Sequence, residues 1–481
     1  MNIHPRAARS GLGSWAWREG SRHHRLFAFA LLLLGALHAG TVHALPLFAR
    51  QTGQPCAACH AGGQFPELTP FGRVFKLTGY TIGTRTVPVS VMAVASDSRV
   101  SNTSKSDDPA ADFQKNGDPL FASASLFLGG KVTDRIGAFV QITYDNYASQ
   151  SDNGDFHGHT GADNIDIRYA NQFSAAGKPV IWGISANNNP SIADPWNTAA
   201  AWMQYVPVPS PTSSSFIDGN APYPGFASGG NLSGISAYAL WNQLLYVEVG
   251  NYRSATGLAS FMSAGVADAE KTRLRGNNPY WRVALTRDWG AHNLMVGTSG
   301  MTADVYDDPL DTSDPATLNR FTDIGIDAQY QYLRDPHAVT LQLAWLRDRH
   351  RYPGFLAGQP VVDINGNALP DTNASDTTRV LRAKASYIFE NRYGGSVAWF
   401  KQTGTTNSLL YDPTRVYGNV SANPGISGET LEAFWTPVQN LRLGAQYTAY
   451  GRYNGATRNY DGQGRNPGDN NSLFLYAWAA Y

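Results

Sequence analysis

Residues 135–147 read RIGAFVQITYDNY and show the clearest alternation of side chains in this sequence. Apolar side chains at every second position from Ile136 to Tyr144 alternate with a second set that includes Gln141 and Thr143. Successive side chains of a β-strand point to opposite faces, so this period of two residues predicts a strand with one apolar face. Residues 323–332 and 441–449 alternate in the same way. The pattern fits a soluble β-sandwich as well as a membrane barrel, and the connections decide between the two.

Sixteen such runs follow one another from residue 87 to the last residue. They begin near Val87, Leu120, Arg135, Asp163, Lys178, Leu232, Gln243, Pro279, His292, Phe321, His337, Asp376, Tyr393, Glu429, Asn440 and Asn471. Short connections lie at 133–134, 175–177, 241–242, 289–290, 334–336, 391–392 and 438–439. The intervening connections are long and polar. An even number of strands, with tight turns at one rim and long loops at the other, is typical of outer-membrane barrels, whose short turns are periplasmic.

We therefore predict an all-β membrane protein, a 16-stranded antiparallel outer-membrane β-barrel over residues 87–481, in contact with outer-membrane lipid. The last run agrees, because it alternates up to a terminal Tyr481 and so resembles the C-terminal strand of such barrels. The register turns charges of both signs inward. These are Asp166, Arg168, Glu248, Arg282, Asp323, Asp327, Arg382, Lys384, Glu432 and Arg442.

The composition excludes other classes of protein. Lys and Arg together number 37, as do Asp and Glu, so the chain lacks the excess of basic residues that a nucleic-acid-binding protein carries. Aromatic residues make up 12% of the chain, which argues against disorder. The one long apolar run, residues 26–39, is too short for a membrane-spanning helix. It follows several arginines and precedes Val42, His43 and Ala44, so residues 1–44 are predicted to be a secretory signal peptide. A retained signal anchor is the alternative.

The only two cysteines are Cys56 and Cys59, and His60 follows them directly in the motif CAACH. This is the attachment pattern of c-type haem, in which both thiols form thioether links to the haem and the histidine ligates its iron. A redox-active cysteine pair and half of a zinc site are the alternatives. The zinc site lacks a second ligand pair nearby, and the redox pair lacks a βαβ context. The motif predicts one covalent haem c and no disulfide.

Residues 45–86 form a compact block around this motif, which we predict to be a cytochrome c-like plug in the barrel lumen. A short helix is expected near residues 67–77, with Thr69 as N-cap and Pro70 at its first position. Arg73 and Lys76 lie one turn apart on this helix and are candidates for neutralising the haem propionates, with a solvated helix face as the alternative.

Residues 45–80, LPLFARQTGQPCAACHAGGQFPELTPFGRVFKLTGY, resemble the start of the mature fused monohaem cytochrome–porin proteins of iron-oxidising bacteria. The likeness is densest in FARQTG, CAACH, FPELTPFGR and FKLTGY. It implies ferrous-iron:cytochrome c oxidoreductase activity, with extracellular Fe(II) as donor and a periplasmic c-type cytochrome as acceptor. Cys56 and Cys59 correspond to the thioether sites of that family and His60 to the proximal ligand. A haem-plugged diffusion porin and a conduit to an external acceptor are the alternative functions.

Met92 is the candidate for the sixth iron ligand, because the first strand turns it toward the lumen beside Ser90 and Val94. His157, His159 and His350 are alternatives that are expected in or beside outer loops. His157 and His159 lie among several aspartates and also form a candidate divalent-metal site in such a loop. The alternative is a solvated polar loop that binds no metal.

Overall fold

The structure is a computed structural model, and it describes residues 47–63, 66–87, 89–102, 116–117, 119–150, 156–196, 231–265, 272–314, 318–351, 373–411 and 418–481. The predicted signal peptide, residues 1–44, lies outside the described residues. No helix in this part of the chain is long and apolar enough to cross a membrane.

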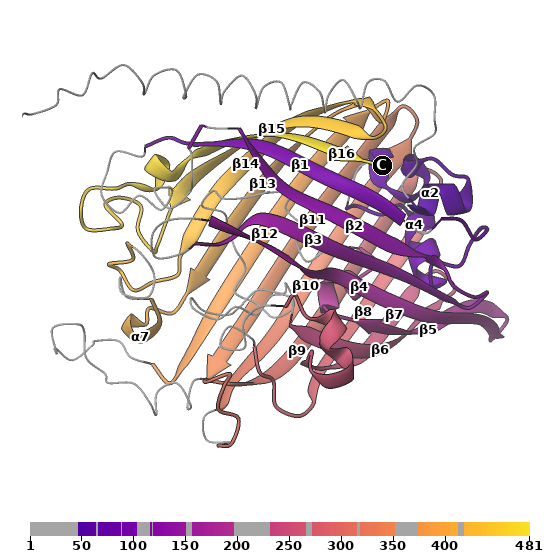
Figure 1. The fold of residues 1–481 in the computed structure, drawn as a ribbon, viewed down its shortest axis with the longest axis horizontal. Helices are drawn as coiled ribbons and strands as arrows, with labels where there is room; N and C mark the ends of the chain where they lie inside the picture. Colours follow the sequence, from indigo (N-terminus) through magenta and orange to yellow (C-terminus); the bar gives the residue numbers. More distant parts are fainter. Residues whose placement is uncertain are drawn as a thin grey trace, which may run out of the picture. The chain divides into compact units, whose positions relative to one another are not determined.

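Sixteen antiparallel strands close into one barrel, in which each strand pairs with its neighbours in sequence and β1 pairs with β16 (Figure 1). The strands are β1 (Val89–Val100), β2 (Leu120–Lys131), β3 (Ile136–Gln150), β4 (Phe156–Ala175), β5 (Lys178–Asn187), β6 (Leu232–Trp241), β7 (Leu245–Ser254), β8 (Asn278–Trp289), β9 (His292–Tyr306), β10 (Leu318–Arg334), β11 (His337–Arg351), β12 (Ser375–Phe389), β13 (Tyr393–Gly404), β14 (Ile426–Val438), β15 (Leu441–Arg452) and β16 (Ser472–Ala480). The predicted 16-stranded antiparallel barrel is thereby confirmed.

The predicted strand starts agree with the observed ones to within three residues, except for β4. That strand begins at Phe156, whereas the alternation predicted a start near Asp163. His157 and His159 therefore lie in β4 and pair with Ser149 and Asp145 of β3, so their placement in a loop was wrong. The segment FHGHTGA at the start of β4 has no apolar alternation, and cross-strand pairing rather than side-chain pattern extends the strand.

Strand β10 shows how the two faces of the wall differ. Asn319, Asp323 and Gln331 are buried on the inward face, while Ile324 and Ile326 on the outward face are 45% and 52% exposed. The same contrast recurs around the barrel, since Val91, Ile235, Val249 and Leu285 are also exposed large apolar residues. An apolar outer surface around a polar interior is the arrangement that a β-barrel needs in lipid.

Short helices precede the barrel. They are α2 (Leu47–Thr52), α3 (Cys56–Cys59), the 3-10 turn η1 (Ala61–Gly63) and α4 (Pro70–Leu77). The helices α2 and α4 lie near one rim of the barrel, the rim at which β16 reaches the C-terminus of the chain (Figure 1). Phe48 of α2 stacks on Tyr80 with ring centroids 5.3 Å apart and packs against Phe139 of β3, so this part of the chain is held by the inner wall.

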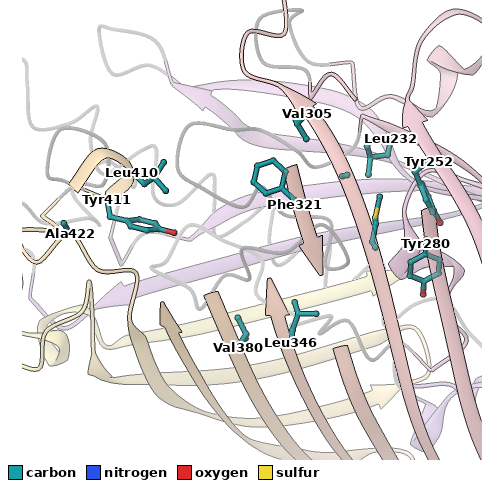
Figure 2. Packing of buried hydrophobic residues seen from close by; sticks show 12 residues of the cluster. Leu232, Tyr252, Tyr280, Val305, Phe321, Leu346, Val380, Leu410, Tyr411 and Ala422 are labelled. Carbon is teal, nitrogen blue, oxygen red and sulfur yellow. The ribbon is translucent and has the colours of Figure 1, made fainter. Parts of the chain in front are cut away.

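Two loop elements fold against inward-facing side chains, α5 (Pro190–Ala193) and α7 (Ser408–Tyr411). Met262 of η2 (Gly257–Met262) packs instead against Ile165 on the outward face of β4, and η5 (Pro467–Asn470) precedes β16. Leu410 and Tyr411 of α7 pack in a buried cluster with Phe321, Leu346 and Val380 of the strands β10 to β12 (Figure 2). This apolar cluster ties the loop after β13 to the long-loop end of the wall.

Candidate haem-attachment site

The CAACH motif forms one turn of helix. Pro55 precedes α3 with extended backbone, and His60 leaves it with extended backbone while its amide donates to the Cys56 carbonyl over 2.8 Å. Both thiols are free, Cys56 being buried and Cys59 half-buried. One turn of chain therefore presents two thiols and an adjacent imidazole, which is the donor set that attaches haem c.

Helix α4 packs directly on this turn. Thr69 is its N-cap, as predicted, and accepts from the Gly72 amide over 3.1 Å, while the Thr69 amide donates to the Cys59 carbonyl over 2.9 Å. A β-bridge joins His60 to Leu68. Gly72 lies so close to Cys59 that a Cβ at position 72 would be 2.1 Å from its carbonyl oxygen. The motif and α4 are thus one packed unit.

Three contacts hold this unit against the barrel wall at the short-turn end. Gly62 has φ of +60° and lies against Ile388 of β12, where a Cβ would approach the Ile388 side chain to 2.5 Å. Glu67 forms an ion pair with Lys384, also on β12, over 2.9 Å. The Cys56 thiol contacts the side chain of Gln439 in the turn between β14 and β15. The motif is therefore fixed to strands far from it in sequence.

The surroundings of the motif favour neutral side chains. Burial raises the pKa of the Cys56 thiol, and burial together with the neighbouring Cys56 raises that of Cys59 to about 11. Burial lowers the pKa of His60 to about 4, so its imidazole is neutral near pH 7. A neutral imidazole is the form that ligates iron, so His60 would not have to release a proton to bind iron at neutral pH.

Arg73 is buried against the inner wall, which excludes a solvated face for this residue. Its guanidinium donates to the side-chain oxygens of Asn293 over 2.6 Å and Gln331 over 3.1 Å, and to the Leu68 carbonyl over 2.7 Å. Burial lowers its pKa to about 10, opposed by Asp288 and Asp194. The role of Arg73 toward haem propionates stays a prediction.

Lys76 is likewise buried, so the solvated-face alternative is wrong for it as well. Its ammonium group donates to the carbonyls of Ile192 in α5 and of Asp194 directly after it, in the connection that follows β5. Burial lowers its pKa to about 8. The sequence predicts a long polar connection between the runs that begin at Lys178 and Leu232, and nothing in its pattern indicates that the first residues of this connection fold inward onto α4.

This inward segment is set into a network of buried charges. Arg168 donates to the Ala193 carbonyl over 2.8 Å and pairs with Asp166 over 2.7 Å. Arg282 lies 3.3 Å from Asp194 and 2.8 Å from Asp327. The predicted register is confirmed here, since these wall residues are all buried on the inward face. Trp196 is 1% exposed, and the guanidinium groups of Arg73 and Arg282 lie 5.9 and 5.5 Å from its ring centroid.

Met92 lies on the inward side of β1, opposite Ala480 and Ser125, where it packs against the buried cluster that contains Val94. Its orientation agrees with the prediction, and its ligation of iron stays a prediction. Among the alternatives, the His159 ring contacts the Ala264 carbonyl, and His350 is buried on β11 with its Nε2 2.5 Å from Asp348. Asp152 and Asp155, two of the aspartates in the candidate metal site around His157, lie outside the described residues. Within the described residues, no group of three or more His, Cys, Asp or Glu side chains could hold a metal ion.

The residues present fit haem c in their donor chemistry. Two free thiols two residues apart on one turn and a neutral imidazole next in sequence satisfy what covalent attachment and proximal ligation require. Cys56, Cys59 and His60 would hold the group.

A comparison with protein-family models and with curated proteins found no match. Among solved structures, the outer-membrane channel DcaP of Acinetobacter baumannii is similar, at 11% identity and a TM-score of 0.44 over 82% of this chain and 96% of that one. OmpF of Salmonella typhi in complex with daunomycin matches at 10% and 0.43, over 82% and 97% of the two chains. An anion-selective porin from Comamonas acidovorans matches at 10% and 0.42, over 82% and 99%. The barrel assignment rests on this chain's own strand pairing.

Proposed function

We propose that this protein is an outer-membrane electron-transfer protein in which Cys56, Cys59 and His60 hold one covalent haem c. The observation that supports it is the CAACH turn, with both thiols outside any disulfide, anchored on the inner wall at the short-turn end of a closed barrel. When bound, haem c supplies reversible one-electron oxidation and reduction. The two cysteines would hold the group through thioether links, and a ring nitrogen of the neutral His60 imidazole would ligate its iron.

The rest of the unit positions these residues. Gly72 allows α4 to approach the motif, and the Glu67–Lys384 ion pair fastens the segment before α4 to β12. Because short turns of such barrels are periplasmic, a periplasmic c-type cytochrome can approach the motif from that side. This placement supports a periplasmic acceptor, and extracellular Fe(II) is proposed as the donor because oxidising it outside the cell keeps insoluble ferric iron out.

The experiment is anaerobic stopped-flow mixing of Fe(II) with the purified, oxidised full-length protein in detergent, followed by the haem absorbance. Reduction with a rate that rises with Fe(II) concentration supports the proposal. A haem that dithionite reduces and Fe(II) does not would overturn the Fe(II) donor while leaving the haem. A redox titration of the same sample then indicates whether the potential favours accepting electrons from Fe(II) or passing them to an external acceptor.

A haem-plugged diffusion porin is the second candidate, and the closed 16-stranded barrel favours it. Against an open channel stands the inward packing of Arg73 on Asn293 and of Trp196 beside Gln329. Planar-bilayer conductance separates the two functions. A large, stable conductance in the wild-type protein would favour diffusion, and small or absent conductance together with Fe(II) reduction favours electron transfer.

A further inference from the structure

Basic side chains gather on the outward face of the barrel at its long-loop end. They lie on four consecutive strands, β10 to β13, and all are exposed. The group, called here the arginine patch, consists of Arg320, Arg347, Arg349, Arg351, Arg379 and Lys401.

The strand register brings the arginines into direct opposition. Arg320 of β10 pairs with Arg351 of β11, and Arg347 of β11 pairs with Arg379 of β12. Like charges directly opposite on neighbouring strands repel and destabilise the sheet. Two such pairs, four residues apart along β11, indicate that this surface calls for a counter-charge.

The described part of the chain supplies little of that counter-charge. Asp304 on β9 forms an ion pair with Arg320 over 2.6 Å. Glu429 on β14 is the other outward carboxylate near the patch, one diagonal step from Lys401. Within the described residues, no carboxylate pairs with Arg347, Arg349 or Arg379.

The height of the patch on the barrel indicates the class of ligand. Outward positions of β11 are apolar from Val339 through Leu341 and Leu343 to Trp345, and Arg347 follows. A tilted strand needs about 9–11 residues to cross the hydrocarbon core, and Arg347 lies about that far beyond the turn at His337. The patch therefore begins where the wall leaves the hydrocarbon, at the level of lipid headgroups.

We infer that the arginine patch binds the phosphate groups of outer-leaflet lipids, with phosphorylated lipopolysaccharide as the ligand class. Guanidinium groups form bidentate hydrogen bonds with phosphate, and an outward-facing array at headgroup height meets lipid phosphates and not a ligand in the lumen. The inference rests on the proposed outer-membrane placement, with short turns in the periplasm, and it is independent of the haem.

The test uses the purified full-length protein in detergent, titrated with lipopolysaccharide of known phosphate content. In the patch variant, Arg347, Arg349 and Arg379 are replaced by Gln. The matched control replaces Arg287, Arg334 and Arg392, exposed near the short turns, and so removes the same charge at the other rim. Binding to the patch variant is expected to weaken about 100-fold, with the control unchanged. Dephosphorylated lipopolysaccharide is expected to bind wild type as weakly as the intact lipid binds the patch variant.

Equal affinities of the two variants, or binding that ignores dephosphorylation, would overturn the inference. Loss of binding in the short-turn control alone would overturn it too, and would reverse the orientation of the barrel. Heat-modifiable migration on gels shows that each variant is a folded barrel. Haem absorbance in the same samples tests the proposed cofactor separately, so the two failures remain distinguishable.

Discussion

Gly72 of α4 lies against the backbone of Cys59, where a Cβ would stand 2.1 Å from the carbonyl oxygen and 3.0 Å from the Cα. Both clashes are with main chain, which cannot swing aside as the end of a side chain can. The spacing between α4 and the CAACH turn is therefore set by the absence of a side chain at position 72. Any residue other than glycine forces the turn and the helix apart.

Gly72→Ala is expected to loosen this unit by about 1–3 kcal/mol, the usual cost of overpacking, and to lower the yield of covalently bound haem. The measurements are the ratio of haem to protein and the hydrogen exchange of residues 70–77. Gly451→Ala is the control, since its Cβ would meet only Ser427 Oγ at 3.9 Å. Wild-type haem content and exchange in Gly72→Ala would contradict the close packing.

The Glu67–Lys384 ion pair is expected to hold the segment before α4 on the wall. Both side chains are largely buried, at 9% and 19% exposed, so Lys384→Met leaves a buried carboxylate unpaired and costs about 1–3 kcal/mol. Hydrogen exchange of residues 66–69 should rise several-fold, while the exposed control Lys178→Met leaves it unchanged. Adding Glu67→Gln should restore part of the protection. If the double variant exchanges as fast as Lys384→Met, the unpaired carboxylate is not the cause.

Met92→Leu keeps an apolar side chain in the packing beside Val94 and removes the sulfur. If Met92 is the sixth ligand, the near-infrared sulfur-to-iron band of the oxidised protein disappears and the midpoint potential falls, because a thioether stabilises reduced iron. Met301→Leu, buried on β9, is the control. An unchanged spectrum and potential in Met92→Leu would eliminate Met92 as the ligand.

The orientation of the barrel predicts which engineered thiols a membrane-impermeant maleimide reaches in intact cells. Leu310→Cys, in the connection after β9 where Leu310 is 66% exposed, should be labelled. Asp134→Cys, in the turn between β2 and β3 with its side chain 93% exposed, should be labelled only after the outer membrane is opened. The opposite pattern would place the CAACH turn at the cell surface and remove the proposed route to a periplasmic acceptor.

The sequence predicts the barrel well because apolar and polar side chains alternate within each strand, as Ile324 and Ile326 alternate with Asp323 and Asp327. It also predicts the capping of α4 by Thr69, since a helix N-terminus depends on residues a few positions apart. These features are local. Strand pairing then follows, because neighbours in sequence are neighbours in the barrel.

What the sequence could not predict depends on contacts between distant residues. The partners of Lys76 are carbonyls more than a hundred positions away, in α5 and directly after it, and no period or motif marks the loop after β5 as one that folds inward. The same holds for Arg73, whose partners Asn293 and Gln331 are known only once the barrel is closed. The spacing of Arg73 and Lys76 predicts that both cations lie on one helix, but it does not predict which groups they bind.

The intact mass of the protein purified from outer-membrane fractions shows whether Cys56 and Cys59 carry covalent haem. The measurement follows denaturation and acid-acetone extraction, which remove haem that is not covalently bound. We expect one haem mass added to the chain and none in the Cys56→Ala/Cys59→Ala variant. That variant should still form a heat-modifiable barrel, because the strands do not include these residues. A wild-type barrel with two unmodified thiols and no added mass would contradict the account.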